Sequence, residues 1–395
     1  MAARASSSRF ITRHLWSVRH CYEFARRRVT ARSAIKISII IFALALALIP
    51  IPAALVERLY SNGLYPNLQS VSTPVANLIP FALVDVLIAS VFVGLPAWWA
   101  VRVAGAGRGR RKMAAARLAF HTLTLAAVIF LAFQLLWGFN YEREPLASKL
   151  DYDEERLTGE ALRQLRRVSV ENLNAESAEA HYGPPVEEEV WREHLHASFD
   201  ETVIRLGNSR GIAAAVPKTS LLNFYLRAAG IEGFINPFGH EVILDSEIFP
   251  FEKPFLLAHE WAHLAGFADE SEASFVGLLA CLRSDVPALR YSALLALYQY
   301  MPRTAPAAPG EAKPVMGLEP PPELAPEVIA DLKAISERDN KHRNVTVSRM
   351  QWAVYDRFLK ANRVRAGVGS YSRFVRLVLG TRFDLDWTPV VRQGS

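Results

Sequence analysis

Three long apolar stretches dominate the first 139 residues of the chain. None is interrupted by the polar face that an amphipathic helix of a soluble core would show. Each is long enough to cross the hydrocarbon core of a bilayer, which takes about 20 helical residues. The pattern therefore predicts a multi-pass α-helical membrane anchor with three spans, at about residues 35–56, 75–101 and 118–139.

The basic residues predict how the three spans are oriented. Nine Arg and Lys against Glu23 alone lie in residues 1–36, and six more with no acidic residue lie in residues 102–117. Cytoplasmic segments are enriched in Lys and Arg, so both segments are expected in the cytoplasm and the chain after Phe139 outside it. A basic leader of this length favours a retained anchor over a cleaved signal peptide. We expect a multi-pass protein of the bacterial cytoplasmic (inner) membrane with an extracytoplasmic domain.

The net charge of +6 does not indicate a nucleic-acid partner. The basic residues flank the apolar stretches, and residues 118–395 carry a net negative charge. The two cysteines, Cys21 and Cys281, are expected on opposite sides of the membrane, which excludes a disulfide within one chain. The lipid bilayer is the predicted partner of the N-terminal region.

Residues 140–395 are predicted to form a mostly α, α+β domain. Helical spacing of apolar residues favours helices in residues 153–176 and 186–207. Residues 256–275 are followed by two further predicted helices, through about Tyr300. Gly, Pro and β-branched residues indicate strands and turns in residues 216–254, with a strand at 240–245. A proline-rich loop is expected at 301–326. Helices at about 327–339, 345–363 and 369–380 complete the prediction.

Asp85 lies in the middle of the second predicted span. An ionisable group in a span is costly and by default suggests a function. The alternative is a structural hydrogen bond to a neighbouring helix, with Asn77 or His121 as the expected partner. The sequence leaves both interpretations open.

The segment HEWAH, residues 259–263, matches the motif HExxH. Residues four apart share one face of a helix, so His259 and His263 are predicted to offer two imidazoles to one metal ion. Catalytic zinc takes three protein ligands and one water molecule, and it lowers the pKa of that water. Glu260 is then the expected general base, which later returns the proton to the leaving amine.

The residues around this motif are almost all apolar, which predicts that its polar groups are buried. Burying unpaired imidazoles and carboxylates costs several kcal/mol, and a bound metal ion removes much of that cost. The alternative is a solvent-facing or salt-bridged cluster. The sequence context favours the metal site.

The third ligand is expected shortly after Gly266, which is a suitable residue to end the motif helix. Three acidic residues follow, Asp269, Glu270 and Glu272. The pattern that starts at Glu270, E-x-x-A-S, resembles the E-x-x-A-D or E-x-x-A-N helix of glutamate-zincins such as the CAAX prenyl proteases, in which the first glutamate binds zinc. This resemblance favours Glu270, with Glu272 second and Asp269 third. Each could also be an ordinary acidic residue at a helix N-terminus.

Several segments together resemble a bacterial family of membrane proteins of unassigned function with a zincin-like domain. They are three N-terminal spans followed by WGFNYEREPL (137–146), GFINPFGHEVILD (233–245), HEWAHLAGFADESEASF (259–275), RYS (290–292) and GVGSYSRFVRLVL (367–379). The resemblance implies a zinc-dependent, peptidase-like domain over most of the chain and no particular substrate. Ser274 departs from the family, which usually has Asn there.

Two further groups of residues are weaker candidates. A cation or a phenol often stabilises the oxyanion formed opposite a catalytic metal, and Arg290, Tyr291 and Tyr371 are candidates for this role. His240 and Glu241, in the strand before the motif helix, are candidates for contact with an extended substrate. A plain edge strand with outward polar residues is the favoured interpretation of that segment.

The sequence thus predicts a membrane-anchored zinc metallopeptidase that hydrolyses a peptide or protein substrate in the cell envelope. One zinc ion per chain is expected as its cofactor. The alternatives are a non-catalytic, zinc-stabilised binding or assembly module, and a zinc hydrolase that acts on a non-peptide bond. A purely structural site has no need of Glu260, and this residue favours an enzyme.

Overall fold

The computed structural model describes residues 31–302, 322–364, 373–384 and 387–392. Of these residues 71% lie in helices, and among them is one two-stranded sheet. The chain divides into two compact units, one of residues up to Pro50 together with Val93–Gln134, and one of Ile51–Phe92 together with Leu135–Ser395. The mostly α prediction is confirmed at this level.

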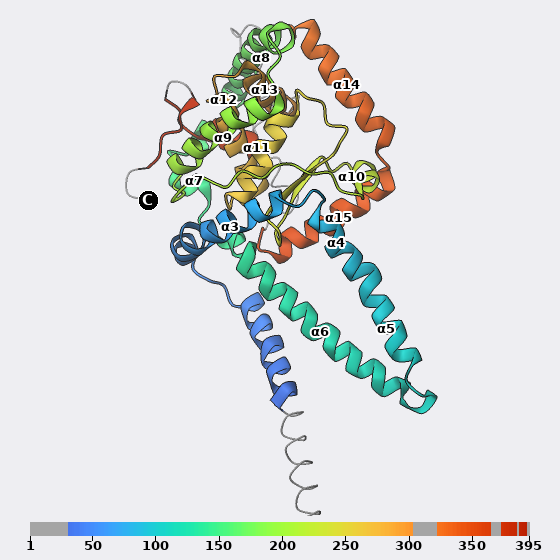
Figure 1. Ribbon diagram of the computed structural model, residues 1–395. Coiled ribbons are helices and arrows are strands. Elements are labelled where there is room, and N and C mark those ends of the chain that lie inside the picture. The colour runs from blue at the N-terminus through green and yellow to red at the C-terminus, as the bar shows by residue number, and fades with distance from the viewer. Residues whose placement is uncertain (1–30, 303–321, 365–372, 385–386, 393–395) are drawn as a thin grey trace, which may run out of the picture. The chain divides into compact units, whose positions relative to one another are not determined.

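Three helices are long and apolar enough to cross a membrane, as the sequence predicted (Figure 1). They are Ala31–Leu48, Leu83–Ala104 and Arg108–Leu136. The second comprises α4 (Leu83–Ala89), η2 (Ser90–Gly94) and α5 (Leu95–Ala104), and the third comprises η3 (Arg108–Arg110) and α6 (Arg111–Leu136). Only 6%, 0% and 17% of their most apolar windows are buried. This exposure excludes the interpretation as buried helices of a soluble core.

The boundaries of the first two spans differ from the prediction. The first ends at Leu48, before Pro50 and Pro52, and the second begins only at Leu83. Between them runs a continuous helical segment of α2 (Ala53–Val56), η1 (Glu57–Leu64) and α3 (Tyr65–Asn77), which we call the 53–77 helix. This helix was not predicted, because residues 53–56 were assigned to the first span and residues 75–77 to the second.

The start of the second span is held by two carboxylates. Asp85 lies in the first turn of α4, and its carboxylate accepts hydrogen bonds from the Ser220 hydroxyl and from the Leu221 backbone N–H. Glu241 accepts from the backbone N–H groups of Leu83 (3.0 Å) and Val84 (2.8 Å). These bonds satisfy N–H groups that a helix start leaves free.

The expected partners of Asp85 were therefore wrong. The Asn77 side chain instead bonds the backbone of Ala214 and Val216, and the His121 ring bonds Lys36. The position of the span explains the error, because its start at Leu83 places Asp85 beside the loop that carries Ser220.

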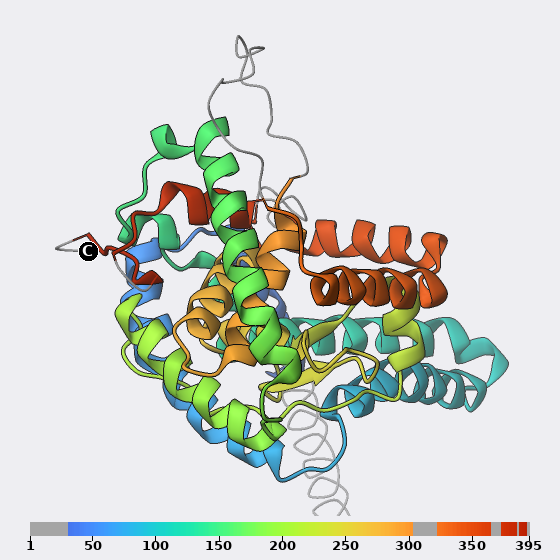
Figure 2. The same cartoon turned by 90° about the horizontal axis from the view of Figure 1, so that it is seen from above.

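The larger unit is built around α12 (Glu270–Leu282), in which every residue except Glu272 is buried. Trp261, Phe275 and Tyr291 are fully buried in the core of this unit. The helices that pack directly against α12 are α9 (Glu188–Arg205), α11 (Lys253–Leu264), α13 (Pro287–Tyr300) and α16 (Phe374–Gly380), and α8 (Gly159–Tyr182) packs against α13. Figure 2 shows the fold from above. The remaining helices are η4 (Gly138–Glu142), α7 (Leu146–Lys149), η5 (Glu154–Arg156), α10 (Asn223–Ala229), α14 (Pro326–His342) and α15 (Val345–Ala361).

Most of these helices match predicted segments. Residues 216–254, predicted as strands and turns, also contain the helix α10, which was not predicted. The sheet in this region is smaller than expected. The greater part of the proline-rich loop and of the basic N-terminus lies outside the described residues.

The sheet pairs β1 (Gly233–Asn236) with β2 (Glu241–Leu244) in antiparallel register, with Gly233 opposite Leu244. On its other side β2 forms a parallel bridge to Lys218. The expectation of an edge strand with outward polar residues at 240–245 is therefore wrong. His240 and Glu241 are fully buried, and their side chains hold other backbone segments in place.

A buried ion cluster joins the 53–77 helix to the rest of the larger unit. The Glu57 carboxylate pairs with Arg143 at 2.8 Å and with Lys149, and Arg143 also donates to Asn208. Burial raises the pKa of Glu57, but the hydrogen bonds and charges of Arg143 and Lys149 outweigh burial and lower it below its ordinary value of 4.5. The folded state therefore holds this glutamate ionised.

We expect Glu57→Gln to destabilise the larger unit because it leaves two buried cations without their counter-ion. Breaking a buried pair in this way costs about 3–5 kcal/mol, which thermal unfolding in detergent would show as a lower midpoint. The pKa of Glu57 is lowered by folding, so its contribution is complete above pH 4.5 and is lost as the pH falls below that value. The difference between variant and wild type should shrink accordingly.

Glu160→Gln is the matched control. It breaks an exposed pair with Arg163, which contributes under about 1 kcal/mol. Equal midpoints for Glu57→Gln and wild type at pH 7 would show that the buried cluster does not stabilise the fold.

Candidate metal centre

The motif helix α11 ends where the sequence predicted. Its last residue is Leu264, and Gly266 has a φ of +87°, in the left-handed region that glycine adopts without strain. The freed backbone carbonyls at this end accept hydrogen bonds from other elements, with the Trp137 indole on His263 and the Tyr65 hydroxyl on Leu264. These bonds fix the end of the helix that carries both histidines.

Helix α12 begins at Glu270 and brings that residue to the motif. The Asp269 side chain caps the helix by accepting from the Ser271 backbone N–H at 2.9 Å. Farther along, Gly277 lies against the backbone of α11, where an added Cβ would be 3.0 Å from the His259 nitrogen. The absence of a side chain at Gly277 allows the two helices to approach closely next to the site.

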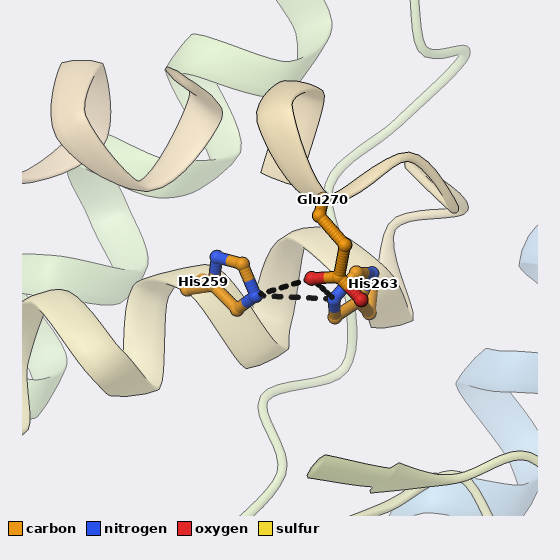
Figure 3. Close-up of side chains that lie close together, drawn as sticks. All are labelled: His259, His263 and Glu270. Atoms are coloured by element: carbon orange, nitrogen blue, oxygen red, sulfur yellow. Dashed lines mark hydrogen bonds and ion pairs between the residues drawn. The ribbon is translucent and has the colours of Figure 1, made fainter. Parts of the chain in front are cut away.

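Three side chains converge at this point (Figure 3). Glu270 Oε2 lies 3.2 Å from His259 Nε2 and 3.3 Å from His263 Nε2, and the two imidazole nitrogens are 3.1 Å apart. Two ligands of a tetrahedral zinc-sized ion are about 3.3 Å apart when each bond is about 2.0 Å. All three residues are buried. The donor set therefore fits one metal ion in size, chemistry and direction.

The pKa shifts of the three side chains also indicate that the cluster binds a positive charge. Burial would raise the pKa of Glu270, but the two histidines lower it well below its usual range. Burial would lower the pKa of His263, but the charge of Glu270 raises it to about 9. Burial lowers the pKa of His259. The glutamate is thus ionised, and a positive charge, a proton or a metal ion, must accompany it.

Outer contacts orient each of the three side chains. His263 Nδ1 donates a hydrogen bond to the Phe267 carbonyl at 2.8 Å. In the neutral ring the lone pair of Nε2 is then available to bind a metal ion. His259 Nδ1 lies 3.1 Å from the hydroxyl of Ser274, the position at which the resembled family usually has Asn. The hydroxyl of Tyr355, on α15, donates to Glu270 Oε1. A hydroxyl thus serves as an outer partner of His259 here.

Glu260 stands beside the three residues without a hydrogen bond at one oxygen. Its side chain is buried, and Oε2 has no partner among the described residues. Burial raises its pKa to about 8. Gly233 of β1 gives it room, since a Cβ there would lie 2.9 Å from Glu260 Oε1. An unpaired buried carboxyl group next to a possible metal site is the arrangement that a general base requires.

The other predicted site residues lie in separate interactions. The Glu272 carboxylate accepts from the Leu146 backbone N–H at 2.6 Å, and Asp269 pairs with Arg373 at 2.7 Å in addition to capping α12. The structure therefore groups Glu270, and not Glu272 or Asp269, with the two histidines.

The predicted oxyanion residues also have other partners. Arg290 forms a two-bond pair with Glu176, and the Tyr291 hydroxyl donates to Asp331 at 2.5 Å. Tyr371 lies outside the described residues. Neither Arg290 nor Tyr291 forms a hydrogen bond or an ion pair with the three clustered side chains, and their bonds are those of structural residues.

The sequence analysis missed two phenols near the site, Tyr355 and Tyr300. Tyr355 is 85 residues away from Glu270, and no local motif marks it. Tyr300 is 38% exposed, but desolvation of its phenol and the negative charges of Glu232, Glu270 and Glu260 raise its pKa, so it stays protonated. The charges of Glu270 and Glu260 raise the pKa of Tyr300 less than burial and the charge of Glu232 do.

The fold and the site define a mostly helical protein with three membrane-length helices and a buried candidate metal centre. Residues 60–379 match the model of the family described as "Protein of unknown function (DUF3810)", and the chain belongs to that family. A search of curated proteins found no match. A search of solved structures found no match either.

We expect the purified protein to contain about one divalent metal ion per chain, and His263→Ala and Glu270→Gln to contain little or none. Each change removes one of three donor atoms. Metal content is measured by mass spectrometry after purification without chelator. Glu272→Gln is the control and should retain the ion, because its carboxylate bonds Leu146 instead. Metal loss from Glu272→Gln but not from Glu270→Gln would overturn this assignment.

Tyr355→Phe should weaken metal binding without abolishing it. Removing an outer hydrogen bond to a ligand typically lowers affinity by about 10–100-fold, which competition with a chelator measures. Tyr225→Phe removes a hydroxyl that donates to Gln351 on the surface, and the metal affinity of this variant should equal that of wild type. Unchanged affinity in Tyr355→Phe would mean that its contact does not orient Glu270.

Proposed function

We propose that this protein is a membrane-anchored zinc metallopeptidase that hydrolyses peptide bonds in the cell envelope. The observation that carries the proposal is the unpaired, buried Glu260 beside His259, His263 and Glu270. A structural metal site needs the three donors and has no use for a fourth, unsatisfied carboxyl group. Two histidines and a carboxylate are donors that suit zinc with one position left open.

In this proposal zinc, when bound, acts as a Lewis acid and lowers the pKa of water at the open position. Glu260 accepts a proton from the attacking water and later donates it to the leaving amine. Glu270 and the two imidazoles hold the ion, and the Phe267 carbonyl and the Tyr355 hydroxyl keep their donor atoms in position. Tyr300 is our candidate for stabilising the oxyanion, because its phenol stays protonated near Glu260.

The free edge of β1 supports a peptide as the substrate. The pairing of Asp245 N–H with the Glu232 carbonyl fixes the alternation, so that the N–H and C=O groups of Gly233 and Ile235 point away from β2. They make no hydrogen bond within the described part of the chain. An extended peptide could add to this edge as a further strand, and Gly233 borders Glu260. A strand added there would pass the general base.

The charge distribution supports an extracytoplasmic location for the larger unit. The first residues of the third membrane-length helix, directly after the turn that follows the second, include Arg108, Arg110, Arg111 and Lys112 and no acidic residue. Basic segments of this kind remain in the cytoplasm. The other ends of these two helices, Leu83 and Leu136, belong to the larger unit, which is then expected outside.

We expect Glu260→Gln to retain the metal ion and to lose peptidase turnover. Loss of a general base typically lowers the rate by about 10²–10⁴-fold. The measurement compares new protein N-termini in the envelope of cells that produce either form, followed by assay of the cleaved peptides with purified protein. Glu189→Gln, at an exposed position, is the control. Equal cleavage by Glu260→Gln and wild type would contradict the proposal, and a non-catalytic metal site would produce no cleavage in either.

A further inference from the structure

The 53–77 helix buries four polar side chains and exposes several large apolar ones. Its buried face carries Glu57, Ser61, Gln69 and Thr73, together with Val56, Tyr60, Tyr65 and Ala76. Arg58 and Asn67 are exposed polar residues of the same helix. Its opposite face carries Leu59, Val71 and Val75, which are 56–68% exposed, and Leu78, at its C-terminal end, is 84% exposed. A helix on a water-facing surface shows the reverse arrangement.

The buried polar side chains are all satisfied by the larger unit. Ser61 donates to Asn140, the Gln69 amide exchanges two bonds with the Ala213 backbone, and Thr73 donates to the His240 carbonyl at 2.8 Å. Glu57 pairs with Arg143 and Lys149 as described above. These hydrogen bonds fix the polar face of the helix against the protein. The apolar face therefore has to point away from the protein.

The flanking segments show what surrounds the apolar face. A membrane-length helix ends five residues before Ala53, at Leu48, and another begins six residues after Asn77, at Leu83. Residues so few cannot carry the chain more than about 20 Å. Both ends of the 53–77 helix are thus held near the membrane boundary by covalent connections.

A second exposed apolar group adjoins the start of the span at Leu83. Leu221 and Phe224 are 85% and 71% exposed, and the backbone of Leu221 is bonded to Asp85 in the first turn of that span. Large apolar side chains fixed next to a membrane helix are placed to enter the layer of lipid headgroups and upper acyl chains.

We propose that Leu59, Val71, Val75, Leu78, Leu221 and Phe224 form a lipid-facing surface that seats the larger unit on the bilayer. The 53–77 helix lies along the membrane interface as an amphipathic helix whose polar side faces protein instead of water. The partner is a lipid surface, contacted in addition to the three spans. The Tyr65 hydroxyl bonds the Leu264 carbonyl at the end of α11, so the same helix connects the candidate metal centre to the membrane.

The test uses nitroxide labels on cysteines introduced one at a time into full-length protein that lacks Cys21 and keeps the fully buried Cys281, reconstituted in nanodiscs of phosphatidylcholine and phosphatidylglycerol. The parent protein without an introduced cysteine is the control for labelling at Cys281. Labels replace Val71, Val75 and Leu221, three exposed positions, so one variant that fails to fold does not decide the outcome. Figure 1 shows that α14 begins at the end of the larger unit farthest from α3. Ile329→Cys, in the first turn of α14 and 53% exposed, is the matched apolar control. Accessibility to oxygen, which concentrates in lipid, is compared with accessibility to a water-soluble nickel chelate.

We expect oxygen accessibility to exceed nickel accessibility several-fold at the three positions and the reverse order at Ile329. Nickel accessibility equal to that of Ile329 would overturn the proposal, because it would place the surface in water. Exclusion of both reagents, with spin–spin broadening that grows as the protein-to-lipid ratio rises, would also overturn it, since a second copy of the chain would then cover the surface.

Discussion

The convergence of two imidazole nitrogens and a carboxylate oxygen within 3.3 Å inside apolar helices is the constraint on which the rest of the structure depends. Burying such groups costs several kcal/mol unless a cation joins them. The surrounding elements are arranged to hold that convergence. Asp269 starts α12 at the right residue, Gly277 lets α12 approach α11, and Gly266 ends α11 after its second histidine.

Residues in or next to the membrane-length helices also contact the elements that form the candidate metal centre. Glu241 of β2 caps the start of the second span, while β1 of the same sheet borders Glu260. Tyr65 and Trp137 bond the last carbonyls of α11. The larger unit is thus built partly from residues that the sequence assigned to membrane spans and the links between them. For the proposed peptidase this arrangement favours substrates close to the membrane surface.

Local spacing was sufficient to predict much of the site. Two histidines four residues apart on an apolar helix, a glycine at its end and an acidic residue at the next helix start are all local features, and the structure brings His259, His263 and Glu270 together. Tyr355 could not be found this way, because α15 meets Glu270 only through tertiary packing. The spacing also could not separate Glu270 from Glu272, since that depends on where α12 begins.

The fold was predictable where apolar residues face inward and not where the pattern is reversed. The regular amphipathic spacing of α8, α9 and α14 was sufficient for those helices. The 53–77 helix was not predicted because several of its buried residues are polar, and these bond to distant backbone groups such as those of Ala213 and His240. Asp85 was misassigned for a related reason, since its partners lie 135 residues and more along the chain.

X-ray absorption at the metal K-edge, on protein purified in detergent without chelator, is the most direct test of the candidate metal centre. We predict zinc with two imidazole nitrogens and oxygen donors at about 2.0–2.1 Å, consistent with His259, His263, Glu270 and water. A zinc spectrum with sulfur donors, or protein that binds no metal ion even after zinc is supplied, would contradict it.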